Sequence, residues 1–115
     1  MKKTIVIAGA TGFIGRWIID IFKKDYNIVA LSRRKTLKSI YDNVTWREVD
    51  LYSISSTENA LKGADYAIYL VHSMQPSTRL NQGKFEDTDL LLADNFSRGA
   101  NTNKVEQIIY LGGII

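Results

Sequence analysis

The feature that most constrains this chain is an apolar run that leads directly into three regularly spaced glycines. The run Ile5-Val6-Ile7-Ala8 is typical of a parallel strand that is buried on both faces of a sheet. Gly9, Gly12 and Gly15 follow with the spacing G-x-x-G-x-x-G, and an amphipathic segment begins at once. The start of the sequence therefore predicts a strand, a tight turn and a helix.

A glycine turn that leads into a helix N-terminus suits the binding of phosphate groups. Unpaired backbone N–H groups and the positive end of the helix dipole both favour an anion there, and glycine allows the phosphates to approach. Thr11, Phe13 and Ile14 lie between the glycines, where backbone amides would meet phosphate oxygens. The Thr11 hydroxyl is either a further donor or part of a plain turn. We expect a dinucleotide pyrophosphate at this turn; the alternative is a turn that binds nothing.

Composition places the chain among single globular domains. With 115 residues, of which 45% are hydrophobic and 23% charged, the chain can bury a core. Its 15 basic and 12 acidic residues favour an anionic cofactor, and this small excess does not indicate nucleic-acid binding. The sequence contains no cysteine, no metal-ligand spacing and no apolar run long enough to cross a bilayer. We therefore expect a cytoplasmic protein with neither nucleic acid nor membrane as a partner.

Alternating patterns predict a doubly wound parallel sheet, the Rossmann arrangement. Strands are expected at 3–8, 27–31, 44–49, 65–71 and 106–111, and helices at 13–24, 53–61 and 85–101, with a polar loop at 73–83. Right-handed crossovers give the strand order 3-2-1-4-5, with a ligand crevice between the first and fourth strands. The expected core residues of the first and third helices are Ile14, Trp17, Ile18, Ile21, Phe22, Leu91, Leu92 and Phe96.

The chain ends directly after the fifth predicted strand. We expect residues 1–115 to be one NAD(P)-binding domain, the N-terminal part of a longer protein. The open edge of the fifth strand would then be available for self-association.

The end of the second strand distinguishes the two nicotinamide cofactors. An acidic residue there would bind the ribose 2′-hydroxyl of NAD, but this chain has Ser32, Arg33 and Arg34. Guanidinium groups bind phosphate oxygens in a bidentate manner, so this cluster favours the 2′-phosphate of NADP over NAD. The alternative is a basic loop exposed to solvent.

Two further segments lie at strand ends that face the expected crevice. Asp50 and Leu51 follow the third strand, and Asp50 is either an acceptor for the exocyclic amine of adenine or an ordinary cap. Val71, His72 and Ser73 end the fourth strand, beneath the expected ribose and nicotinamide. His72 is either a proton-transfer group, since histidine is the side chain suited to that role near neutral pH, or a wall or satisfied loop residue. The second alternative is favoured because no carboxylate or nucleophile is visibly paired with it.

Together these motifs resemble the short-chain dehydrogenase/reductase superfamily. The resemblance is closest to its extended and atypical members, the nucleoside-diphosphate-sugar epimerase and NmrA-like group. It covers essentially the whole chain and is carried by residues 8–15, 31–33, 49–51, 69–74 and 108–113. It implies that the three glycines form the pyrophosphate turn, that Arg33 meets the 2′-phosphate and that Asp50 with Leu51 frames the adenine. It also implies that residues 71–73 border the ribose.

The chain departs from typical members of this superfamily at two points. Gly112 and Gly113 stand where a catalytic Ser or Thr follows the fifth strand, and the Tyr-x-x-x-Lys pair would fall beyond Ile115. We expect an NADP(H)-binding domain of an epimerase-like or reductase-like protein, without a complete active site of its own and with an unidentified small-molecule substrate. The alternative is a non-catalytic, NmrA-like module that reads the NADP/NADPH ratio.

Overall fold

The computed structural model describes residues 2–33, 39, 41–70 and 82–111. Within these ranges the elements follow one another as β1 (Thr4–Ala8), α1 (Phe13–Phe22), β2 (Asn27–Ser32), β3 (Val44–Glu48), α2 (Ile54–Ala60), β4 (Tyr66–Tyr69), α3 (Gln82–Thr102) and β5 (Gln107–Tyr110). The strands form one sheet in the order β3-β2-β1-β4-β5, and all four pairings are parallel. The predicted α/β fold and strand order are confirmed.

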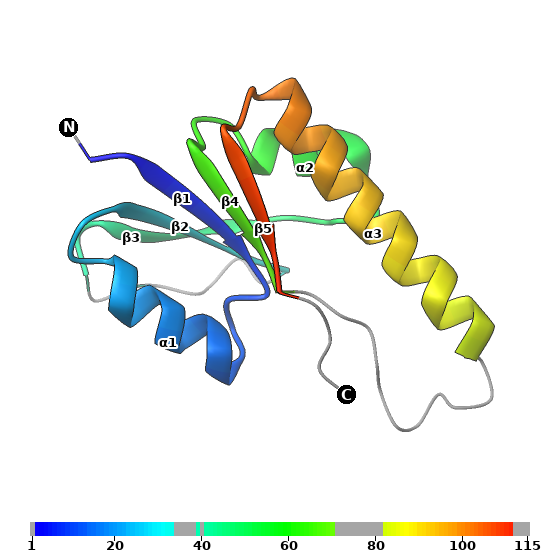
Figure 1. Ribbon diagram of the computed structural model, residues 1–115, viewed down its shortest axis with the longest axis horizontal. Helices are drawn as coiled ribbons and strands as arrows, with labels where there is room; N and C mark the ends of the chain where they lie inside the picture. The colour runs from blue at the N-terminus through cyan, green and yellow to red at the C-terminus, as the bar shows by residue number, and fades with distance from the viewer. Residues whose placement is uncertain (1, 34–38, 40, 71–81, 112–115) are drawn as a thin grey trace.

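The sheet is the middle of three layers. Helix α1 covers one face, and α2 and α3 lie side by side over the other (Figure 1). A hydrophobic core lies on each face of the sheet, and alternate residues of β1 pack into one or the other. Ile5 and Ile7 pack on the α1 side, and Val6 and Ala8 pack on the side of α2 and α3. This burial on both faces explains why the first strand is a continuous apolar run.

Only part of the predicted apolar face of α1 is buried. The residues that are buried are Gly15, Ile18 and Ile19. The prediction is wrong for three residues of that face, which are 49%, 61% and 44% exposed: Ile14, Trp17 and Ile21. The reason is Gly15, because a Cβ there would lie 2.5 Å from the Ala10 Cα. This close contact sets the rotation of α1 about its axis, so the positions three and four residues after Gly15 face the sheet.

Helix α3 packs through a narrower face than predicted. Leu92 and Phe96 are buried as expected, but Leu91 is 47% exposed, so its assignment to the core is wrong. The helix begins at Gln82, so the predicted loop at 73–83 is wrong for its last two residues. Gly99 brings α3 close to α2, since a Cβ there would meet Leu61 Cδ1 at 3.0 Å. No helix in the described ranges is both long and apolar enough to span a bilayer.

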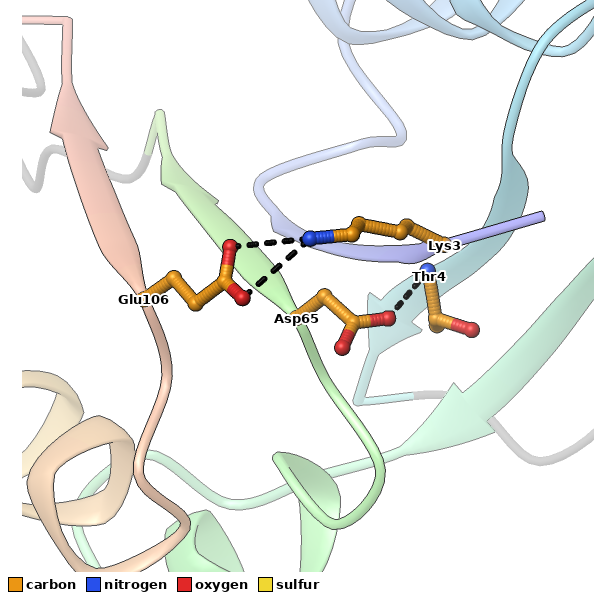
Figure 2. Close-up of polar contacts among 4 residues, drawn as sticks. All are labelled: Lys3, Thr4, Asp65 and Glu106. Carbon is orange, nitrogen blue, oxygen red and sulfur yellow. Dashed lines mark hydrogen bonds and ion pairs between the residues drawn. The ribbon is translucent and has the colours of Figure 1, made fainter. Parts of the chain in front are cut away.

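Polar contacts join three strands at the amino edge of the sheet. The Lys3 Nζ lies 3.2 Å from each carboxylate oxygen of Glu106, and Asp65 Oδ2 accepts a hydrogen bond of 2.8 Å from the Thr4 N–H (Figure 2). The hydrogen bond to Glu106, followed by one to Tyr66, raises the pKa of Lys3. Because the Lys3 and Glu106 side chains are about half exposed, this pair adds little stability. These contacts lie at the edge opposite the candidate site.

Candidate dinucleotide-binding site

The candidate site lies at the carboxyl edge of the sheet, where the strand order reverses. Ala8 at the end of β1 pairs with Leu31 of β2 on one side and with Tyr69 of β4 on the other. The chain then turns onto α1, which covers one face, whereas β4 connects onward to α3 on the opposite face. The strand order reverses at β1, and the helices that follow β1 and β4 cover opposite faces of the sheet. These two features define a topological switch point, the usual place for a ligand in an open parallel sheet.

The turn after β1 presents backbone amides at the start of α1. Gly9 adopts φ +87°, a left-handed conformation that favours glycine, and its carbonyl accepts from the Gly12 N–H at 3.5 Å. Gly12 is the N-cap of α1 and offers no side-chain acceptor, and the bond from Arg16 N–H to Gly12 O, at 3.1 Å, begins the helical ladder. The backbone N–H groups of residues 13–15 come before this first helical bond, so no carbonyl group of the helix accepts a hydrogen bond from them.

The last two glycines of the turn have different surroundings. A Cβ on Gly15 would meet the Ala10 backbone at 2.5–2.8 Å, so this glycine is required by the fold itself. Among the residues that the structure describes, a Cβ on Gly12 would meet nothing nearer than Gly9 O at 3.9 Å, and its φ of −79° is open to any residue. Thr11, Gly12, Phe13 and Ile14 are exposed around it. The fold therefore does not require glycine at position 12.

A pocket lies at the ends of β2 and β3. Its volume is about 430 Å³, and its lining residues are Arg33, Glu48, Val49, Asp50 and Ser56. Ser32 pairs with Glu48 in the sheet, and the Val49 N–H donates to Ser32 O at 2.8 Å. The register of β2 and β3 thus brings Arg33 to the same pocket as Glu48 and Asp50. Among the described residues, one cation and two carboxylates line this space.

Short-range hydrogen bonds shape the loop after β3. The Asp50 N–H donates to Ser56 Oγ at 2.9 Å, and Asp50 Oδ1 accepts from the Tyr52 N–H at 3.0 Å. Ser53 caps α2, because its Oγ accepts from the Ser56 N–H. The Asp50 carboxylate therefore holds a local turn and also lines the pocket, whereas the cap of α2 is Ser53.

The structure brings together part of the predicted site. Ser32 is buried at the end of β2, and Arg33 follows it as an exposed residue of the pocket wall. Leu51 is half buried and packs against the core on the α2 and α3 side. Four predicted residues lie outside the described ranges: Arg34, Val71, His72 and Ser73. Two lining residues were missed, Glu48 and Ser56. Sequence spacing gave no signal for Glu48, because it enters the pocket through the register of β3 with β2.

Fold and site together define a doubly wound nucleotide-binding domain of the Rossmann type. Residues 5–113 match the family described as NAD dependent epimerase/dehydratase. The chain belongs to this NAD dependent epimerase/dehydratase family, which confirms the resemblance seen in the sequence.

Individual relatives agree with this assignment. The chain is 30% identical over 114 residues to auxiliary protein GraX of Staphylococcus aureus (strain NCTC 8325 / PS 47), covering 98% of this chain and 37% of that protein. It is 28% identical over 124 residues to UDP-glucose 4-epimerase of Rickettsia bellii (strain RML369-C), covering 96% of this chain and 36% of that one. In fold it is similar to UDP-N-acetylglucosamine 4-epimerase from Bacillus cereus, with a TM-score of 0.75 at 24% identity over 95% and 36% of the two chains. The chain thus spans little more than a third of the length of these relatives.

Proposed function

We propose that this chain binds NADP(H) and serves as the cofactor domain of an epimerase-like or reductase-like protein. The family supports a dinucleotide ligand. The observation that carries the proposal is the open space at Gly12, directly in front of the first-turn amides of α1. No described residue excludes a side chain from that space, whereas a pyrophosphate bound by those amides would exclude one.

Replacing Gly12 with alanine therefore tests the proposal. We expect the affinity for NADPH to fall by about 1.5–3 kcal/mol, the value of a lost hydrogen bond to a charged group. The free energy of unfolding should change by less than about 1 kcal/mol, because alanine is a poorer N-cap but also restricts the unfolded chain. Isothermal titration calorimetry measures the first quantity and urea denaturation the second.

The two measurements distinguish the outcomes. Weaker NADPH binding at unchanged stability supports a ligand in front of Gly12. Unchanged binding would show that the pyrophosphate does not lie at this turn. A wild-type protein that binds neither NADPH, NADP, NADH nor NAD would overturn the proposed function itself.

The cofactor preference depends on which pocket residue meets the ribose. Arg33 would bind a 2′-phosphate, which favours NADP(H). Glu48 lines the same pocket, and as a carboxylate it could accept from a 2′-hydroxyl and would repel a phosphate, which favours NAD(H). We propose that Arg33, rather than Glu48, determines the cofactor preference. Arg33 directly follows β2, the position at which dinucleotide folds distinguish the two cofactors.

Replacing Arg33 with alanine should separate these alternatives. We expect NADPH to bind more weakly by about 1.5–3 kcal/mol, because a charge-assisted hydrogen bond to the 2′-phosphate is lost, with little change for NADH. Calorimetric titration with both cofactors gives the comparison. Equal losses for the two, or a wild-type protein that binds NADH more tightly than NADPH, would refute the role of Arg33.

A non-catalytic binding module is the second candidate. It is favoured by the similarity to a protein named as auxiliary and by Gly112 and Gly113 in place of a hydroxyl side chain. Such a module would bind NADP(H) without transferring hydride. A Tyr-x-x-x-Lys pair further along the gene would favour the enzyme, since that pair is the part of the family active site that this sequence does not contain.

A further inference from the structure

One buried side chain of α3 reaches across to the loop that borders the pocket. Asn95 is 6% exposed, and its Nδ2 donates a hydrogen bond of 2.8 Å to the carbonyl oxygen of Leu51. Leu51 directly follows Asp50, which lines the pocket, and Asn95 lies 44 residues further along the chain. The bond therefore joins two parts of the fold that are far apart in the sequence.

A polar residue at this position is not explained by packing. Leu92 and Ala100 lie buried on the same helix, and an apolar residue at position 95 would fill the core without a polar group. A buried amide is costly unless it is hydrogen-bonded, and the Leu51 carbonyl satisfies it here. The side-chain amide of Asn95, a residue of α3, therefore forms a hydrogen bond to the loop after β3.

The hydrogen bonds of Asp50, Tyr52 and Ser53 in this loop are local, and Val49 at its start bonds to β2. Asp50 N–H binds Ser56 Oγ, Tyr52 N–H binds Asp50 Oδ1, and Ser53 N–H binds Asp50 O. These bonds shape the loop but do not attach it to the layer of α3. Among the described residues, the Asn95 side chain supplies that attachment by a hydrogen bond.

We infer that Asn95 is a positioning residue for the adenosine end of the NADP(H) site. By holding the Leu51 carbonyl, it fixes the loop that carries Asp50 on the pocket wall. This inference rests on the proposed function for its ligand, but the attachment of the loop can be tested without one.

Asn103, the residue directly after α3, offers a matched control. Its Nδ2 also donates to a backbone carbonyl of another element at 2.8 Å, but that carbonyl belongs to Glu58 of α2. The same Nδ2 donates a second bond of 2.8 Å to Gly99 O of α3. Asn95→Ala and Asn103→Ala therefore remove the same kind of bond, with and without a connection to the pocket loop. Asn95→Ser is a second, milder variant, because a helical serine can bond back to its own helix without reaching Leu51.

Hydrogen exchange tests the attachment in the ligand-free protein. In Asn95→Ala and Asn95→Ser we expect the amides of Tyr52 and Ser53 to exchange about ten times faster, the effect of one lost hydrogen bond. In Asn103→Ala these amides should keep their wild-type rates. Unchanged rates in both Asn95 variants would overturn the inference, whatever the protein binds.

Calorimetric titration tests the effect on binding. We expect Asn95→Ala to weaken 5′-ADP and NADPH by the same factor, about tenfold, because the loop contacts only the adenosine half that both share. Asn103→Ala should leave both affinities unchanged. Equal losses in the two variants, or a larger loss for NADPH than for 5′-ADP, would show that Asn95 acts through general stability or another part of the site. If wild type binds neither compound but the loop amides respond as expected, the proposed function fails while the attachment stands.

Discussion

Replacing Gly15 with alanine is expected to lower the free energy of unfolding by about 3 kcal/mol, the upper range for overpacking a close contact. The added Cβ would lie 2.5 Å from the Ala10 Cα and 2.8 Å from the Ala10 carbonyl carbon and oxygen. These are backbone atoms, which cannot rotate away as a flexible side chain could. Relief requires α1 to move away from the turn. Urea denaturation measures the loss, and Gly12→Ala is the matched control because its Cβ meets no such contact.

The same displacement should impair binding in the variant that remains folded. The first-turn amides of α1 and the Gly9 turn act together only while the helix stays close to Ala10. We therefore expect Gly15→Ala to lose both stability and NADPH affinity, whereas Gly12→Ala loses affinity alone. Wild-type stability in Gly15→Ala would contradict the close packing of α1 against the turn.

The strand order could be predicted because each strand of the sheet centre is an unbroken apolar segment. The run at 5–8 is buried on both faces, and the helical segments between strands leave right-handed crossovers as the regular connection. Edge strands are less distinct: β5 exposes three of its four residues and β3 buries only one of its five, yet the predicted segments at 44–49 and 106–111 still contain them.

The rotation of α1 could not be predicted from periodicity. The helix carries apolar residues on two overlapping faces, one with Trp17 and Ile21 and one with Ile18 and Ile19. Spacing alone favours neither face. The close approach of Gly15 to Ala10 selects the second, and that contact is visible only once the turn has been built.

The candidate site was predictable where one segment forms it and not where two strands meet. The glycine turn lies within a single strand–turn–helix unit, so spacing was enough to locate it. Arg33 and Asp50 were each identified at the end of a strand, but Glu48 enters the pocket because β3 pairs with β2 in a particular register. That register depends on tertiary pairing, and so does the hydrogen bond from Asn95 to Leu51.

Truncating Phe96 to alanine should cause the largest loss of stability in this chain, about 3–5 kcal/mol. Phe96 is fully buried, and its ring stacks on Tyr69 with centroids 5.0 Å apart, so it holds α3 against β4. Chemical denaturation measures the loss, and Leu90→Ala on the same helix should change stability by less than about 0.5 kcal/mol because Leu90 is 69% exposed. A loss below about 1 kcal/mol in Phe96→Ala would contradict the tight packing of α3.

Ligand binding should partly restore the Phe96→Ala protein. Phe96 lies in the core and does not line the pocket, so the folded variant should still bind NADPH. A ligand at 100 times its dissociation constant stabilises the folded state by about 2.7 kcal/mol, which offsets much of the cavity cost. The Asn95→Ala protein should gain less at the same NADPH concentration, because its affinity is reduced. The adjacent residues Asn95 and Phe96 would thus separate the two contributions of α3, one to the pocket and one to the core.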